Sequence, residues 1–160
     1  MNFPFLNNAH DAAPIYCLTV EEFPEWLQSQ EAEMQLWAQR CGVMGKAGEV
    51  LISASEVVAI HDGTFSSFAS IAEKLKGGTY QYEGLDDEYL EKAVLAWGMA
   101  TYRYQEFKKN GNSIPHLIWP EGIDQGSLVA LLESITMIRD LINQPANFLT
   151  PKTLAEKAEV

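Results

Sequence analysis

Apolar residues recur at helical spacing through much of the second half of the chain. One unbroken stripe follows the acidic run Asp86–Glu88 and precedes the lysines at 108–109: Leu90, Ala93, Val94, Trp97, Ala100, Thr101, Tyr104 and Phe107. Carboxylates at the start of a helix and cations at its end are stabilised by the helix dipole. The pattern predicts one long helix that ends before Asn110 and Gly111.

A second stripe predicts the next helix, which either Asp124 or Ser127 would cap. Its apolar positions predict one buried face: Leu128, Leu131, Leu132, Ile135, Ile138 and Ile142. Between the two helices, the short apolar run His116–Trp119 predicts a strand.

The amino-terminal part begins with a β-prone run at Ile15–Thr19 and continues as a helical pattern. Thr19 and Glu22 have the spacing of a capping box, and Pro24 falls in the first turn, where its missing N–H costs nothing. Helical spacing then continues to Gly42, a residue suited to a left-handed stop: Phe23, Trp26, Leu27, Met34, Trp37, Ala38 and Cys41. The spacing allows either one helix or two with a break near Ser29.

Two short runs rich in Val and Ile, 49–53 and 56–61, are separated too briefly for a crossover helix. They predict an antiparallel hairpin. A helix should follow, capped by Asp62 or Thr64 and stopped by the glycines at 77–78, with the stripe Phe65, Phe68, Ile71, Ala72 and Leu75. The alternating residues 79–82 then predict another strand.

Strands and helices alternate in the second half, which implies a right-handed βαβ crossover and a sheet with helices on both faces. The predicted fold class is therefore α/β. The aromatic and leucine stripes are interpreted as core, with no ligand role.

Composition narrows the possible partners. The 160 residues are 47% hydrophobic, as in ordinary globular domains, and carry a net charge of −11. Such a charge repels nucleic acid and anionic membranes, so neither is expected as a partner. The basic residues Arg103, Lys108 and Lys109 are interpreted as helix-end cations. No signal peptide and no run of 18 apolar residues is present, which predicts a soluble cytoplasmic protein.

Residues suited to catalysis or metal binding are scattered. His10, His61 and His116 form no HExxH motif, and Cys17 and Cys41 form no CxxC motif, so both cysteines are interpreted as buried hydrophobes. The glycines at 77–78 follow a helix rather than a strand and match no phosphate loop. The acidic pairs Glu21–Glu22 and Asp86–Asp87 fall at predicted helix starts. We predict no catalytic, cofactor-binding or metal-binding residue in this chain.

The last residues begin a further helix. Thr150 can cap it, Pro151 takes its first position, and Leu154, Ala155 and Ala158 start an apolar face. A helix this short is marginal alone in water and needs a surface to pack on. The pattern predicts a domain over residues 1–144 and, over 145–160, the start of a linker to an absent further domain.

The residues at this junction carry a resemblance. Residues 139–147 read Arg-Asp-Leu-Ile-Asn-Gln-Pro-Ala-Asn and are followed by Leu149, Thr150 and Pro151. They resemble the junction segment of the leucyl (cytosol) aminopeptidase family, usually RDLxNTPAN followed by TP, with Gln144 in the place of Thr. Weaker similarity to the family's amino-terminal domain extends upstream through residues 37–40, 46–50, 75–82 and 97–104.

The resemblance implies a three-layer α/β/α domain with a mixed sheet, related to macro domains, and a linker helix to a catalytic domain. In the family, that domain holds two divalent metals, zinc or manganese, and removes amino-terminal residues from peptides, usually in a homo-hexamer. The family's metal-binding segments, a Lys followed by FDTGG and NTDAEGR, have no counterpart here, so no catalytic residue carries over. The expected role is a non-catalytic structural and assembly domain. A macro-like module that binds ADP-ribose is the alternative, and a small stand-alone enzyme is a third possibility.

Overall fold

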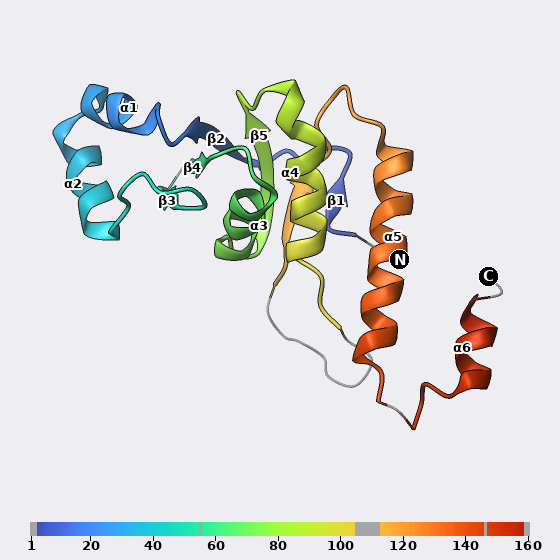
Figure 1. Ribbon diagram of the computed structural model, residues 1–160. Helices are drawn as coiled ribbons and strands as arrows, with labels where there is room; N and C mark the ends of the chain where they lie inside the picture. The colour runs from blue at the N-terminus through green and yellow to red at the C-terminus, as the bar shows by residue number, and fades with distance from the viewer. Residues whose placement is uncertain (1–2, 55, 105–112, 146, 159–160) are drawn as a thin grey trace.

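A mixed sheet of six strands forms the centre of the molecule in the computed structural model, which describes residues 3–54, 56–104, 113–145 and 147–158 (Figure 1). The strands are β1 (Phe5–Leu6), β2 (Ala13–Thr19), β3 (Val50–Ile52), β4 (Val57–His61), β5 (Gly78–Glu83) and β6 (Pro115–Ile118). Their order is β1-β6-β5-β2-β4-β3, and all neighbours are parallel except the β3–β4 hairpin. The predicted α/β class, the hairpin and the mixed sheet are confirmed.

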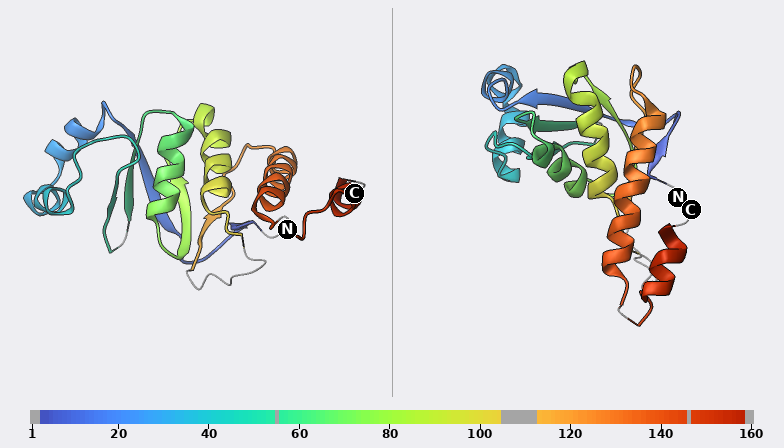
Figure 2. Two further views of the ribbon diagram at one scale, coloured as in Figure 1. Left: turned by 60° about the horizontal axis from the view of Figure 1, so that its bottom comes forward. Right: turned by 45° about the vertical axis from the view of Figure 1, so that its right-hand side comes forward.

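Six described helices connect or follow the strands: α1 (Phe23–Ser29), α2 (Ala32–Cys41), α3 (Phe65–Lys74), α4 (Asp87–Ala100), α5 (Gln125–Asn143) and α6 (Pro151–Ala158). Helices α3, α4 and α5 follow one another in a row, with α6 beyond α5 (Figure 2). Alternation along β4 separates the layers: Val57 and Ala59 join the core under α3 and α4, whereas Val58 packs with Ala38 of α2. Helices therefore lie on both faces of the sheet.

The question of one helix or two between residues 20 and 41 is settled by a break at the end of α1. Ser29 Oγ donates to Trp26 O over 2.7 Å, and the backbone becomes extended at Gln30 and Glu31 before α2 begins. A serine hydroxyl that bonds a helix carbonyl competes with the backbone ladder. The bonds of the predicted capping box form, because Glu22 Oε2 accepts from Thr19 N over 2.8 Å and Glu22 N donates to Thr19 Oγ1 over 3.2 Å. They close the turn before the helix, since α1 begins only at Phe23.

The predicted buried stripe on α2 is wrong in part. Ala38 is its one buried residue, whereas Trp37 and Cys41 are exposed. Gly42, with φ 71°, ends α2 in the left-handed conformation, as predicted. Because α2 touches the sheet only at its margin, a single narrow row of side chains reaches the core.

The other cap predictions are resolved in favour of one residue each. Thr64 caps α3 and Asp124 caps α5, in both cases by accepting a bond from the backbone of a serine three residues on. Helix α3 ends at Lys74, before the glycines at 77–78, because Leu75 turns into the core in an extended conformation.

The long helix predicted to approach Asn110 ends instead at Ala100. Thr101 Oγ1 donates to Trp97 O over 2.7 Å, and Arg139 from α5 donates to Met99 O over 2.8 Å. Arg103 donates to Ala100 O over 2.9 Å. Arg139 and Arg103 thus satisfy carbonyls that a continuing helix would bond itself.

Arg103 thus acts at the helix end, as predicted, although the end lies earlier. Tyr104 is outside the helix. Phe107, Lys108, Lys109, Asn110 and Gly111 lie outside the described residues.

The predicted buried face of α5 is also wrong in part. Leu128 and Leu132 are buried, together with Thr136, but Leu131 and Ile138 are exposed. Ile142 is exposed as well. Helix α5 is the outermost of the α3–α4–α5 row, so α4 covers only one flank of its apolar stripe (Figure 2).

Trp97 is the largest fully buried side chain, with an exposed fraction of 0%. Its ring lies edge-on to Tyr82, with centroids 6.1 Å apart, and its Nε1 donates to Pro115 O over 3.3 Å. One residue of α4 therefore contacts β5 and bonds the start of β6.

We expect Trp97→Ala to lower the free energy of unfolding by about 3–5 kcal/mol, because it removes a large buried ring and leaves a cavity. Trp97→Phe keeps an aromatic ring and should cost clearly less. Urea unfolding followed by circular dichroism measures both. A loss below about 1 kcal/mol for Trp97→Ala would show that the ring does not hold the core together.

The two cysteines differ in environment. Cys17 on β2 packs against the main core, and burial raises the pKa of its thiol to about 12. Cys41, at the end of α2, is exposed, which corrects the prediction that both are buried. A thiol with this pKa has a negligible thiolate fraction near neutral pH, so Cys17 is not an activated nucleophile.

In Ellman titration at pH 8 we therefore expect one fast thiol per native chain and a second only in denaturant, because thiolate is the reactive form. Cys41→Ala should abolish the fast phase, so that the one remaining thiol reacts only in denaturant. Fast labelling of Cys17 in native Cys41→Ala protein would contradict the burial of its thiol.

Candidate functional site

The carboxyl ends of the parallel strands form the edge of the sheet at which open α/β sheets usually bind their ligands. Here β2, β4 and β5 end at Thr19, His61 and Glu83. The chain turns from these ends toward α1, α3 and α4 (Figure 1).

His61 is buried at this edge as part of an aromatic cluster. Its ring stacks on Phe68, with centroids 5.0 Å apart, and lies 5.2 Å from the ring of Tyr89. Its Nδ1 accepts a bond from Gly63 N over 3.2 Å. Burial lowers the pKa of His61, against the opposing pull of Glu22 and other carboxylates. A neutral imidazole that supports the following turn is the chemistry this arrangement allows.

The carboxylates nearby are engaged in turns. Asp62 Oδ1 accepts from Thr64 N over 3.0 Å and from Thr64 Oγ1 over 2.6 Å, and these bonds lower the pKa of Asp62 to about 2. The bonds from Thr19 likewise lower the pKa of Glu22. Asp86 occupies the N-cap position of α4, next to Asp87 in its first turn. The lowered pKa values of Asp62 and Glu22 make these two carboxyl groups poor general acids near neutral pH.

A cavity of about 450 Å³ lies at the carboxyl ends of β5 and β6. Trp119, Leu85 and Leu90 give it apolar walls, while Gln81 and Glu121 add polar groups. Its described lining contains no Lys or Arg, and the Glu121 carboxylate repels anions. These features disfavour a diphosphate ligand such as ADP-ribose.

The three histidines lie in different settings: His61 at the end of β4, His116 within β6, and His10 exposed before β2. Among the described residues no three His, Cys, Asp or Glu side chains come together in a way that could hold a metal ion. The chain as described offers no ligand set for a metal. That the chain has no catalytic and no cofactor-binding residue stays a prediction.

The outer flank of α5 is a surface that the sequence pattern did not identify. Leu131, Ile138 and Ile142 form a row on this flank, which we call the α5 ridge, and the exposed fractions of the two isoleucines are 53% and 77%. The six apolar positions of α5 have the width that is usual for a single core-facing stripe, so the sequence carried no signal that part of the stripe is exposed.

Polar contacts fix α5 to the end of α4. Tyr102 Oη donates to Asp140 Oδ1 over 2.6 Å, and Asn143 Nδ2 donates to Tyr102 Oη over 3.3 Å. The guanidinium of Arg139, already bonded to Met99 O, lies 5.4 Å from the centre of the Tyr102 ring. Partial burial and the bond to Asp140 raise the pKa of Tyr102. The first residues of the 139–147 motif therefore orient the ridge.

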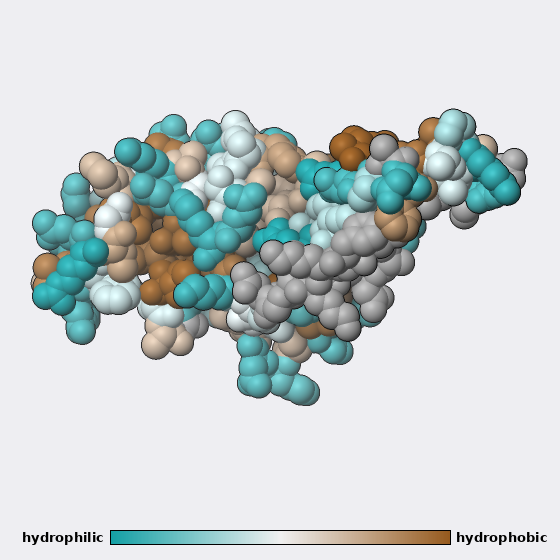
Figure 3. Space-filling model, turned by 90° about the horizontal axis from the view of Figure 1, so that it is seen from below, coloured by the Kyte–Doolittle hydropathy of each residue, from teal (hydrophilic) through white to brown (hydrophobic). Residues whose placement is uncertain are grey.

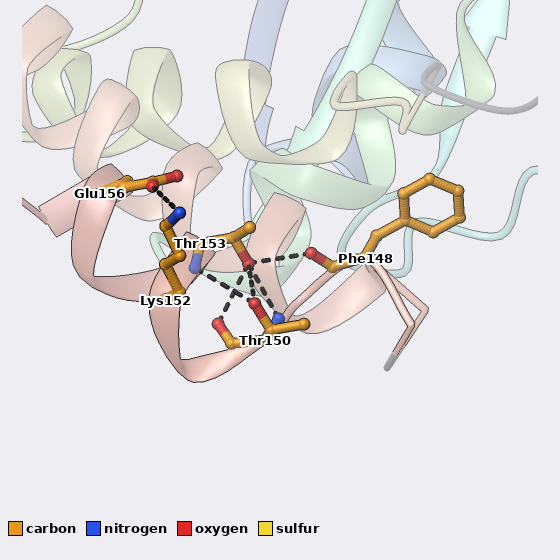
Figure 4. A network of polar contacts seen from close by, with 5 residues as sticks. All are labelled: Phe148, Thr150, Lys152, Thr153 and Glu156. Atoms are coloured by element: carbon orange, nitrogen blue, oxygen red, sulfur yellow. Dashed lines mark hydrogen bonds and ion pairs between the residues drawn. The ribbon is translucent and has the colours of Figure 1, made fainter.

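The remainder of the motif leads into α6, where a threonine pair organises the turn (Figure 4). Thr153 N donates to Thr150 Oγ1 over 3.3 Å, and Thr150 N donates to Thr153 Oγ1 over 2.8 Å. Thr153 Oγ1 also donates to Phe148 O over 2.9 Å. The predicted cap at Thr150 is confirmed, and Pro151 begins α6 as predicted. The predicted boundary after residue 144 coincides with the end of α5, and the division into two domains stays a prediction.

No helix in the described part of the chain is long and apolar enough to cross a membrane.

Similar proteins share both sequence and fold with the chain. A probable cytosol aminopeptidase of Treponema denticola is 38% identical over a match that covers 44% of this chain and 17% of that protein. The crystal structure of a cytosol aminopeptidase from Coxiella burnetii has a TM-score of 0.80 at 29% identity, covering 97% of this chain and 36% of that one. The bottromycin maturation enzyme BotP shares the fold, with a TM-score of 0.61 at 20% identity over 92% of this chain and 36% of its own.

The chain thus spans about a third or less of the length of these relatives. A family model described as the amino-terminal domain of M17 aminopeptidases matches residues 13–120, which extend from β2 through β6. The chain belongs to the M17 aminopeptidase family and corresponds to its amino-terminal domain.

Proposed function

We propose that this chain is a non-catalytic structural domain that positions the catalytic domain of an aminopeptidase, an enzyme that removes amino-terminal residues from peptides. The observation that carries the proposal is the α5 ridge, an apolar surface that runs into the 139–147 motif of a domain matched to the amino-terminal part of M17 aminopeptidases. Contiguous exposed apolar surface is typical of an interaction site.

The ridge suits a permanent contact. Ile138 and Ile142 present β-branched side chains that lose little entropy when covered. Burial of such a side chain contributes up to about 1.5–3 kcal/mol. Since Arg139 and Asp140 bind the end of α4, the orientation of a domain seated on the ridge would follow that of the sheet.

Helix α6 supports the same proposal. Leu154 is exposed, and no residue of α6 belongs to either apolar core of the described residues. In Figures 1 and 2 this helix lies beyond α5, on the side of the molecule away from α1 and α2. A partner domain in contact with both the ridge and α6 would cover both apolar surfaces.

The chemistry of peptide cleavage belongs, in this proposal, to the partner domain. Two divalent metals, zinc or manganese, would supply Lewis acidity and a nucleophilic water there. The described residues do not fit such a centre, because they bring no three metal-binding side chains together. We further propose that the whole enzyme assembles as a homo-hexamer, in line with the resemblance of the 139–147 motif.

The purified 160-residue chain should not hydrolyse leucine-p-nitroanilide with added zinc or manganese, because it lacks a described metal-binding group. Release of p-nitroaniline is followed by absorbance, with a complete M17 aminopeptidase as the positive control. Metal-dependent turnover that co-purifies with the chain would overturn the non-catalytic assignment.

Ile138→Lys with Ile142→Lys should change the unfolding free energy of the 160-residue chain by less than about 0.5 kcal/mol, because both side chains are exposed and cations suit the carboxyl end of a helix. In a protein that also carries the catalytic domain, the same double variant should lower the melting temperature and the aminopeptidase activity. Ala130→Lys, an exposed position of α5 outside the ridge, is the matched control. Equal behaviour of the control and the double variant would remove the ridge as the docking surface.

A further inference from the structure

A groove lies on the opposite side of the molecule from the α5 ridge, between α2 and the edge strand β3. It has a volume of about 570 Å³. Met34, Trp37 and Ile52 contribute apolar surface, and the charged side chains at its rim are Glu31, Glu33 and Arg40. Figure 3 shows hydrophobic surface between polar groups on the side of the molecule where α2 and β3 lie.

The groove meets β3 at Ile52, and the outer backbone edge of the strand continues from there to Val50. Strand β3 is last in the sheet order, and within the described residues only β4 pairs with it. Ser53 N donates to Glu56 O, and Ile60 N donates to Glu49 O, each over 2.9 Å. Because bonded pairs alternate in an antiparallel ladder, Leu51 bonds β4 while the amides and carbonyls of its two neighbours point outward.

Those neighbours are Val50 and Ile52, so the outward edge offers two amides and two carbonyls. Trp37 Nε1 donates to Ile52 O over 3.2 Å, which leaves this carbonyl a second lone pair. Unpaired edges of this kind are templates for an added strand.

The side chains beside the edge favour an apolar contact. Trp37 and Ile52 each keep an exposed fraction of 44% although both touch the groove. A half-exposed Trp with its N–H already bonded presents a flat apolar face to a neighbour. An incoming strand that places one apolar side chain here would cover both residues.

The rim adds a charge preference. Glu31 and Glu33 lie at the start of α2, whereas Arg40 lies in its last turn. The net charge of −11 over the whole chain strengthens attraction to a cationic segment. The same charge on two copies disfavours pairing of β3 with a second copy of itself.

We propose that this groove binds an extended, cationic segment of another protein, which adds to β3 as a strand. An apolar side chain of the segment lies on Trp37 and Ile52, and a Lys or Arg lies beside Glu31 and Glu33. Val50 and Ile52 supply the backbone hydrogen bonds. This binding is independent of the proposed docking of a catalytic domain, because it uses the other end of the sheet.

The test titrates the chain with a short blocked peptide that alternates threonine with valine or isoleucine and carries a lysine at each end. In amide NMR spectra we expect shifts centred on Val50 and Ile52, and hydrogen exchange of these two amides slowed by about tenfold or more. Unchanged exchange at saturating peptide would overturn the proposal. Peptide binding with amide shifts centred on residues outside β3 and the groove would overturn it as well.

Three comparisons sharpen the test. Glu31→Lys with Glu33→Lys should weaken binding by about five- to tenfold, while Glu25→Lys, an exposed carboxylate on α1 outside the groove, should not. A peptide whose β3-facing amides are methylated should not bind. Equal binding of the methylated peptide, or of one with glutamates in place of the lysines, would contradict strand addition by a cationic segment.

Whether a second copy of this chain pairs with β3 is tested separately, by sedimentation of the chain without peptide. A monomer is expected. A dimer that the peptide dissociates would identify another copy of this chain as the occupant and would overturn the proposal.

Discussion

Close packing of α4 on both of its neighbours holds this domain together. On the sheet side, Trp97 fills the core and bonds the backbone at Pro115. On the other side, a Cβ added at Gly98 would lie 2.7 Å from the methyl carbons of Leu132, so the missing side chain lets α5 approach. Two consecutive residues of α4 thus join the sheet to the outermost helix of the row. Together with the polar bonds of Arg139 and Asp140, this contact sets the orientation of α5 and of the ridge on its outer flank.

The placement of polar groups supports the proposal that the domain is a scaffold rather than a catalyst. Asp62 and Glu22 bond to threonines at helix starts, and His61 supports a turn from within an aromatic cluster. Each group is committed to a backbone or hydroxyl partner, and the pKa of each carboxyl is lowered by those bonds. Side chains used in this way stabilise local structure and are not free to transfer protons near neutral pH.

Apolar surface, by contrast, remains available at both ends of the sheet. The ridge lies on α5, beyond β6, and the groove lies along β3 at the opposite edge. They differ in kind: the ridge presents side chains of one helix, whereas the groove combines side chains with an open backbone edge. A rigid domain suits the former and an extended segment the latter.

Several elements could be read from the sequence because their signals are local. The capping box at Thr19, the left-handed stop at Gly42 and the cap at Thr150 each depend on residues a few positions apart. The succession of strand and helix patterns in the second half rests on equally local signals, and it sufficed for the α/β class. The motif at 139–147 is as local, and it carries a resemblance to the family that the match over residues 13–120 shows.

Boundaries and exposure, however, were decided by tertiary contacts. Helix α4 stops at Ala100 because Arg139, distant in sequence, bonds one of its last carbonyls, and no local pattern encodes that contact. The exposure of Ile138 depends on which flank of α5 meets α4. Periodicity specifies that a residue lies on an apolar face of a helix. Only the packed structure decides whether another element covers that face, because burial is a property of the neighbours.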